Sequence, residues 1–146
     1  MALDDNIGRL LAETEITLHP DSFTIVSIDR SEEDKARGIL ADLDPFSSLT
    51  FDVAEVSLVV RAEDWEVLRE RFNVYREEGP YRLITFDIVL DLSIVGFMAV
   101  VSRRLADEGV SIYALSTYLR DHILVKEGDC VKAVEALRSL IAENRQ

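Results

Sequence analysis

The chain has 146 residues, 48% of them apolar, and its 28 acidic against 16 basic residues give a formal charge of -12. A chain of this length buries about 70% of its unfolded surface, so a sizeable core needs no disulfide or metal clip. A phosphate backbone would repel this charge, and we expect no nucleic acid partner. No apolar run reaches the roughly 20 residues of a membrane span, so we expect no membrane partner either.

The cysteine count and the N-terminus indicate the compartment. Cys130 is the only cysteine of the sequence, so an internal disulfide is impossible. The first residues lack the basic flank and apolar stretch of a secretory signal. Both features are typical of a protein in a reducing environment, and they predict a cytoplasmic location.

The first half of the chain is predicted to open with two short strands, 15–18 and 23–28, separated by a turn at residues 19–21. A helix follows, with a charged first turn and an apolar stripe, and it ends before Pro45. The stripe has helical spacing and consists of Ala36, Ile39, Leu40 and Leu43.

Two β-rich stretches, 48–52 and 55–61, precede a short second helix, and a strand at 73–76 is predicted to close this half. The short helix carries three large apolar side chains on one side: Trp65, Leu68 and Phe72. Gly79 and Pro80 then interrupt the pattern. We place the boundary between two modules there, giving modules of residues 1–78 and 79–146.

The second half repeats the order of elements with a clearer pattern. Its first strand places four apolar residues on one predicted core face: Ile84, Phe86, Ile88 and Leu90. A helix over 95–107 follows, and Gly109 occupies the position of a left-handed C-terminal cap. Its stripe consists of Ile94, Met98, Val101 and Leu105. Strands at 111–118 and 122–126 lead to a last helix, capped by Asp129, that buries Val134, Leu137 and Ile141.

The two halves match in the order and spacing of their elements. Phe23 corresponds to Phe86 and Glu55 to Asp121, and each half runs strand, helix, strand, strand, helix. This self-similarity indicates a duplicated unit of the ferredoxin-like βαββαβ type. The predicted fold is therefore α+β, with a tandem pair of modules whose antiparallel sheets carry helices on one face.

The second copy lacks a last strand, because only polar residues follow its final helix. The strand at 15–18 precedes the first copy and has no place in it. We therefore predict that this N-terminal strand pairs into the sheet of the second module and completes it.

The stretch SRRLADEGVSIYALSTYLRDHILVKEGD, residues 102–129, resembles small tandem ACT proteins, the subfamily that includes the mammalian cytosolic arginine sensor. The resemblance implies a regulatory, amino-acid-binding fold that dimerises through its sheets. It also implies a ligand held where the loop after a first strand meets a neighbouring module. Two positions depart from the family. Arg120 and His122 flank Asp121, where a small polar residue and an aromatic are usual, and the first copy reads IDRSEED where the second reads DLSIVG.

The loop from Asp91 to Gly96 leads into a helix, whose free N–H groups and positive dipole end suit an α-carboxylate. Ser93 is a candidate donor to that carboxylate, and Asp91 or Asp121 a candidate partner for an α-ammonium. The remaining candidate ligand-binding residues are Ile94, Val95, Thr117, Tyr118 and Arg120. The structural alternative is that Ser93 caps the helix, Gly96 allows close packing, and Arg120 is a solvated turn residue.

Catalytic and metal chemistry are not expected. The sequence has no GxSxG elbow, P-loop, HExxH or dinucleotide fingerprint. His19 and His122 lie in separate halves with no spaced Cys or His set, so neither a metal nor a cofactor is predicted. Cys130 is interpreted as a structural thiol.

Two functions remain open from the sequence. The first is a homodimeric regulatory protein that senses a small molecule, an amino acid by resemblance, at the interface between ACT modules. The second is a ligand-free module that binds a partner protein through an exposed sheet edge.

Overall fold

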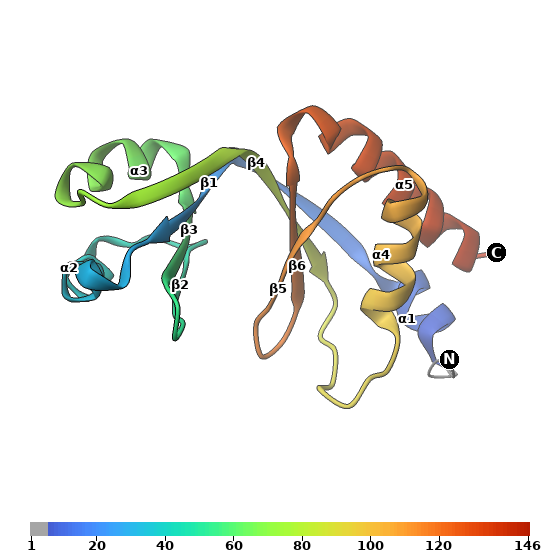
Figure 1. Cartoon of the computed structure of the whole chain (residues 1–146). Helices are drawn as coiled ribbons and strands as arrows, with labels where there is room; N and C mark the ends of the chain where they lie inside the picture. The colour runs from blue at the N-terminus through green and yellow to red at the C-terminus, as the bar shows by residue number, and fades with distance from the viewer. Residues whose placement is uncertain (1–5) are drawn as a thin grey trace. The chain divides into compact units, whose positions relative to one another are not determined.

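The computed structural model describes residues 6–146, and Figure 1 shows its elements in chain order. Within this range no helix combines the length and the apolar character needed to cross a bilayer. The helices are α1 (Ile7–Glu13), α2 (Glu33–Gly38), α3 (Ala62–Leu68), α4 (Phe97–Asp107) and α5 (Cys130–Asn144). The strands are β1 (Glu15–Ile28), β2 (Ser48–Phe51), β3 (Val56–Arg61), β4 (Tyr75–Asp87), β5 (Tyr113–Ser116) and β6 (Asp121–Lys126).

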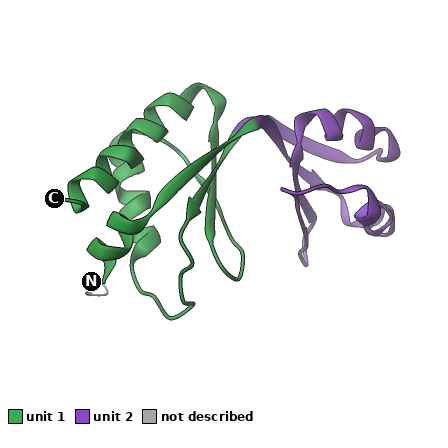
Figure 2. Ribbon diagram, turned by 180° about the vertical axis from the view of Figure 1, so that it is seen from behind, with its two compact units in different colours: residues 1–20, 82–146 green, residues 21–81 purple. Residues whose placement is uncertain are grey.

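The chain divides into two compact units, which are coloured separately in Figure 2. Unit 1 comprises residues 1–20 and 82–146, of which 1–5 lie outside the described residues, and unit 2 comprises residues 21–81. Two long strands, β1 and β4, each contribute one segment to each unit. This division differs from the expected modules of residues 1–78 and 79–146.

Unit 2 has the element order of a ferredoxin-like module: β1, α2, β2, β3, α3, β4. Its strand order is β2-β3-β1-β4, and β3 pairs antiparallel with both β1 and β2, for example at Val26↔Leu58 and Leu49↔Leu58. The alternating side chains of β1 and β3 point into a core shared with the helices. Trp65 of α3 and Ala36 of α2 belong to this core.

Unit 1 contains β4, α4, β5, β6 and α5, together with α1 and the first segment of β1. Its strand order is β5-β6-β4-β1, with β5 and β6 antiparallel from Tyr113↔Leu124 to Ser116↔Asp121. Helices α4 and α5 cover one face of this sheet (Figure 1). The core between them contains Ile84, Phe86, Val101, Leu105, Ile123, Val125 and Leu137.

The segment of β1 in unit 1 runs antiparallel to β4. Thr17 contacts Asp87 and His19 contacts Thr85, so the residue numbers rise on one strand as they fall on the other. Ile16 and Leu18 pack against the core of this unit. The N-terminal strand therefore lies beside the second half of the chain, where its lack of a place in the first half led us to expect it.

Two predicted interruptions are absent, because each long strand continues through its local turn signal. The turn expected at residues 19–21 was wrong: β1 runs unbroken to Ile28, and Arg82 Nη2 donates to the carbonyl oxygen of His19 at 2.9 Å. The boundary expected at Gly79 and Pro80 falls inside β4. A Cβ at Gly79 would lie 3.1 Å from the carbonyl oxygen of Phe23, so glycine permits the close approach of β1 and β4 there.

The helices differ from expectation mainly at their ends. Leu40 is exposed and does not belong to the buried stripe as predicted; it begins the short 3-10 helix, residues 40–42, that follows α2. Asp129 precedes α5, but its side chain makes no capping hydrogen bond. Strand β4 ends at Asp87, so Ile88 and Leu90 reach the core only from the loop that follows. The left-handed glycine cap is confirmed: Gly109 has φ 72° and donates to Ala106 at 2.9 Å.

Candidate ligand-binding site

A pocket of about 320 Å³ lies in unit 1, between the loop that follows β4 and the turn that joins β5 to β6. The loop supplies residues 90–92, 94 and 96, the first turn of α4 supplies Phe97 to Ala99, and the β5–β6 turn supplies the opposite wall. Seven of the nine sequence-predicted site residues line it: Asp91, Ile94, Gly96, Thr117, Tyr118, Arg120 and Asp121. Ser93 and Val95 do not line it.

The loop begins with a tight turn built by Asp91 and Ser93. Asp91 Oδ1 accepts hydrogen bonds from the Ser93 hydroxyl at 2.6 Å and from the Ser93 backbone N–H at 2.8 Å. These bonds, the hydroxyl first, lower the pKa of Asp91 below its ordinary value, so this carboxylate stays ionised at neutral pH. Ser93 was expected to cap the helix or to donate to a ligand. It does not cap α4, whose N-cap position is Gly96, and Asp91 already uses its hydroxyl hydrogen.

Gly96 sets the direction in which α4 leaves the loop. Its φ of 101° is a left-handed conformation that L side chains rarely adopt. Val100 N–H is the first to bond within the helix, to the Gly96 carbonyl at 3.1 Å. The N–H groups of Phe97, Met98 and Ala99 precede it and have no acceptor in the helix. All three residues line the pocket, so the positive end of α4 faces this space.

The β5–β6 turn forms the opposite wall and is held from two sides. Thr117 N–H donates to the Arg120 carbonyl at 2.9 Å, which closes the turn, and Leu90 N–H donates to the Leu119 carbonyl at 3.0 Å, which ties the turn to the loop. Tyr118 at the tip is 77% exposed. The pocket is thus formed by two backbone segments in direct hydrogen-bond contact.

The charged side chains around the pocket are two carboxylates and one guanidinium. Arg120 Nη1 donates to Asp87 Oδ1 at 2.6 Å, and Thr17 donates to the other oxygen of the same carboxylate. Arg120 is therefore an exposed turn residue whose guanidinium is paired with Asp87. Asp121 Oδ1 accepts from the Ser116 hydroxyl at 2.7 Å. The carboxylates of Asp91 and Asp121 remain without a cation partner among the ion pairs of the described residues.

The loop and the turn that form the pocket carry large apolar side chains that are exposed to solvent. They come from the loop and from the turn: Val89, Leu92, Val95, Tyr118 and Leu119. Leu92 is 72% exposed although it lines the pocket. An exposed apolar cluster of this kind marks an interaction surface more often than a random patch does. Val95 and Tyr118 were predicted as site residues from the sequence, whereas Val89, Leu92 and Leu119 were not, because apolar residues in a loop and a turn form no periodic pattern.

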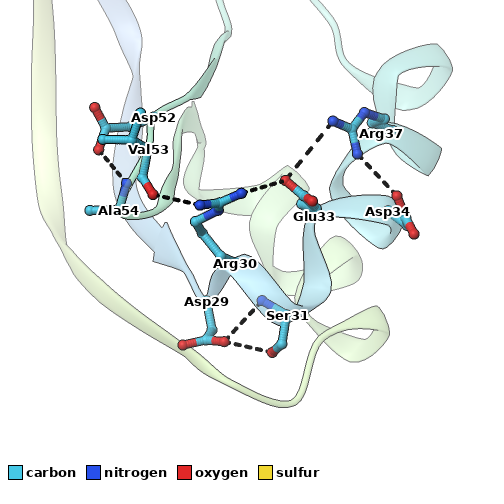
Figure 3. Close-up of polar contacts among 9 residues, drawn as sticks. All are labelled: Asp29, Arg30, Ser31, Glu33, Asp34, Arg37, Asp52, Val53 and Ala54. Atoms are coloured by element: carbon cyan, nitrogen blue, oxygen red, sulfur yellow. Dashed lines mark hydrogen bonds and ion pairs between the residues drawn. The ribbon is translucent and has the colours of Figure 1, made fainter.

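Unit 2 contains the same kind of loop after its own first strand, shown in Figure 3. Asp29 Oδ2 accepts from Ser31 N–H at 3.0 Å and from the Ser31 hydroxyl at 2.5 Å, as Asp91 does from Ser93. Here, however, the intervening Arg30 donates from Nη1 to the Val53 carbonyl at 2.8 Å, in the β2–β3 turn. Its Nη2 lies 3.9 Å from Glu33 of α2. One arginine therefore bridges the loop, the turn and the helix of unit 2.

The surroundings of this second loop differ from those of the first. A pocket of about 400 Å³ in unit 2 is lined by Asp29, Ala54 and Tyr75, among others, but by no residue of α2. It therefore lacks the helix-start amides that line the pocket of unit 1. The position between Asp91 and Ser93 is Leu92, which has no group that could form the bridge made by Arg30.

The two histidines, expected in separate halves, both lie in unit 1. His19 Nε2 lies 2.9 Å from Thr85 Oγ1, which in turn lies 2.9 Å from His122 Nδ1. Burial, then the charges of Arg120 and His19, lower the pKa of His122 below its ordinary value. Sequence analysis missed this contact because three separate strands carry its members. Among the described residues, no three His, Cys, Asp or Glu side chains are grouped to hold a metal ion.

Comparison with known proteins identifies the type of fold. Residues 77–139 match a family model described as ACT domain, and this range contains every residue that lines the unit 1 pocket. A search of curated proteins found no match.

Solved structures match over most of the chain. A Vibrio cholerae protein of unknown function, described as a possible transport protein, is 21% identical with TM-score 0.72, over 93% of this chain and 96% of its own. An Agrobacterium tumefaciens protein is 21% identical with TM-score 0.67, over 88% of this chain and 89% of its own. The regulatory subunit of aspartate kinase from Thermus thermophilus, in a ligand-free form, is 12% identical with TM-score 0.66, over 86% and 97%. At these identities the likeness shows the fold, which is the ACT fold.

Proposed function

We propose that this ACT-domain protein is a regulatory sensor that binds a small zwitterion, an amino acid, in the pocket of unit 1 and catalyses no reaction. The observation that carries the proposal is the pairing of opposite charges across one small space. Phe97, Met98 and Ala99, whose N–H groups have no acceptor within the helix, line the same pocket as Asp91 and Asp121. The helix-start N–H groups attract an α-carboxylate, and the carboxylates attract an α-ammonium.

Size and exposure support this assignment. A volume of about 320 Å³ is at the small end of ligand pockets, which suits a single amino acid rather than a nucleotide. Gly96 brings the backbone close to the pocket without a Cβ in the way. The regulatory subunit of aspartate kinase, which shares the fold, is a further argument for a regulatory rather than a catalytic module.

We further propose that the two units derive from one duplicated module and that the protein works as a homodimer. Both units have the strand order of a ferredoxin-like module, and both begin their first helix after an Asp-x-Ser turn. The exposed apolar residues around the pocket are suited to contact a module of a second chain. Ligand bound there would lie at the interface between ACT modules and would change the stability of that interface.

A thermal-shift screen tests the proposal. A ligand that binds only the folded protein stabilises it by RT ln(1 + [L]/Kd), about 2.7 kcal/mol at a concentration 100-fold above Kd. We expect one amino acid, or a few related ones, at millimolar concentration to raise the melting temperature selectively. Flat curves for every amino acid would contradict it and would favour the partner-binding module with its sheet edges at β2 and β5.

The chain itself offers a matched control for the site. Asp91→Asn removes a carboxylate from the pocket, whereas Asp29→Asn removes its counterpart from the same kind of turn in unit 2. In both variants the amide oxygen can still accept the two serine hydrogen bonds, so both lose the charge of the turn and keep its geometry. We expect the ligand-induced shift to vanish only in Asp91→Asn, and an equal loss in both variants would place the ligand elsewhere.

A further inference from the structure

We propose that His122 is a positioning residue for the pocket: a hydrogen-bond relay through His19, Thr85, His122 and Thr117 holds the β5–β6 turn in place, and a proton taken up by His122 releases it. The role of the relay in ligand binding rests on the proposed function. The relay itself does not, and it can be tested without a ligand.

The relay crosses the sheet of unit 1 and ends at the wall of the pocket. His19 on β1 contacts Thr85 on β4 at 2.9 Å, and Thr85 contacts His122 on β6 at 2.9 Å. His122 Nε2 then lies 3.3 Å from Thr117 Oγ1, at the start of the turn. Thr85 and His122 are each 2% exposed, so water cannot substitute for these contacts.

The donor and acceptor roles follow from the pocket end of the relay. Thr117 Oγ1 donates to the Arg120 carbonyl at 3.2 Å, so its oxygen accepts from His122 Nε2–H. A neutral imidazole with its proton on Nε2 presents Nδ1 as an acceptor. The Thr85 hydroxyl therefore donates to His122 Nδ1 and accepts from His19 Nε2–H. Every hydroxyl of the relay then donates once and accepts once.

A second proton on His122 disrupts this pattern of donors and acceptors. It can bind only at Nδ1, which turns that nitrogen from an acceptor into a donor. The Thr85 oxygen would then face two N–H donors, and its own hydrogen would have no acceptor. Protonation of His19 has no such effect, because Nε2–H is already the donor there. The relay therefore tolerates a cation at its β1 end but not at its centre.

Burial is the main factor that opposes protonation of His122. The charged and titratable groups that face it are Arg120 from the β5–β6 turn, Asp121 from β6, Asp87 from β4 and His19 from β1. Burial, Arg120 and His19 lower the pKa of His122, and the two carboxylates act against them. The pKa of His122 is thus lower than its ordinary value, and the neutral form predominates at neutral pH. Since the unfolded chain takes up this proton first, the stability linked to His122 is present at neutral pH and is lost as the pH falls.

The experiment uses the full chain without ligand. Nitrogen chemical shifts of the imidazoles report the tautomer of His122 at pH 7 and its titration. Amide hydrogen exchange of Thr117, which closes the turn on Arg120, reports whether the turn is held. Ala54, whose N–H donates to Asp52 in the β2–β3 turn of unit 2, serves as the reference amide for the pH dependence of exchange itself.

We expect the proton of His122 on Nε2 at pH 7, and a loss of Thr117 protection relative to Ala54 as His122 titrates. Thr85→Val keeps the shape of the side chain but removes the hydroxyl. The amide of Thr117 should therefore lose its protection relative to Ala54 already at pH 7. Thr85→Ser restores the hydroxyl and should restore the wild-type pH profile. His122→Gln should give a protection ratio that no longer follows pH.

Three results would overturn the proposal: a proton on Nδ1 of His122 at pH 7, Thr117 protection that is unchanged while His122 titrates, or a Thr85→Val profile equal to wild type. The first two are measured on the unmodified protein, so a variant that fails to fold does not block the test. A flat amino-acid screen would remove the proposed function and leave these measurements intact.

Discussion

Two glycines hold left-handed backbone in unit 1, and only one of them lies at the pocket. Gly96 has φ 101° and Gly109 has φ 72°. An alanine in a left-handed conformation costs about 1 to 2 kcal/mol, so Gly96→Ala and Gly109→Ala should each lower the free energy of unfolding by about that amount. Only Gly96→Ala should also weaken the ligand-induced thermal shift, because Gly96 lines the pocket and Gly109 does not. Equal ligand response in both variants would argue against a role for the Gly96 backbone.

Glu32 is the carboxylate with the strongest shift in unit 2. Its contact with the Lys35 ammonium, followed by the backbone N–H of Val74 and of Asn73, lowers its pKa from 4.5 to about 2. Because this pKa is depressed in the folded state, the linked stability is present above pH 4.5 and is lost as the pH falls toward 2. Glu32→Gln should lower the urea midpoint at pH 7 and should show a smaller further loss between pH 4.5 and pH 2.

Glu33→Gln is the matched control for Glu32. Glu33 is the next residue of the chain, and its carboxylate lies 3.9 Å from two arginines on a partly exposed surface. Such pairs contribute little to stability. The urea midpoints of Glu33→Gln should therefore equal those of wild type across the same pH range. A loss equal to that of Glu32→Gln would show that the buried hydrogen bonds of Glu32 stabilise the fold no more than an exposed ion pair does.

At the scale of elements, β1 is the strand that completes unit 1. Ile16 and Leu18 pack against the core of unit 1, whereas Glu15 beside them is exposed. The double variant Ile16→Ala and Leu18→Ala should lower the free energy of unfolding by about 1 to 3 kcal/mol in urea titrations, while Glu15→Ala should stay within about 0.5 kcal/mol of wild type. An unchanged midpoint in the double variant would mean that the strand contributes nothing to this core.

At the scale of the whole molecule, the two Asp-x-Ser loops should differ in function. Arg30 bridges the loop of unit 2 to Val53 and Glu33, whereas the corresponding Leu92 of unit 1 is exposed. We therefore expect isothermal titration of a ligand found in the screen to give one molecule per chain. Arg30→Ala should leave this number and the affinity unchanged, because the loop it holds is not the binding loop. Two ligands per chain would contradict this difference between the loops.

The amino-acid sequence by itself determined the element types, the ferredoxin-like order and most of the pocket. These features depend on local periodicity, as in the buried stripe of α4, and on short segments such as residues 91–96, whose neighbours in sequence are their neighbours in space. The resemblance of residues 102–129 to ACT proteins agrees with the family match over 77–139.

The tertiary structure alone decided which segments join. His19 to Asp21 and Gly79–Pro80 carry turn signals, yet β1 and β4 run straight through them, because pairing between the two long strands outweighs local preference. The same pairing places His19 next to Thr85 and Thr17 next to Asp87. The contacts of the relay from His19 to Thr85 and from Thr85 to His122 span 66 and 37 positions, and Arg120 pairs with Asp87 33 positions away. Contacts over such separations leave no periodic trace in a sequence, so they became visible only in the folded chain.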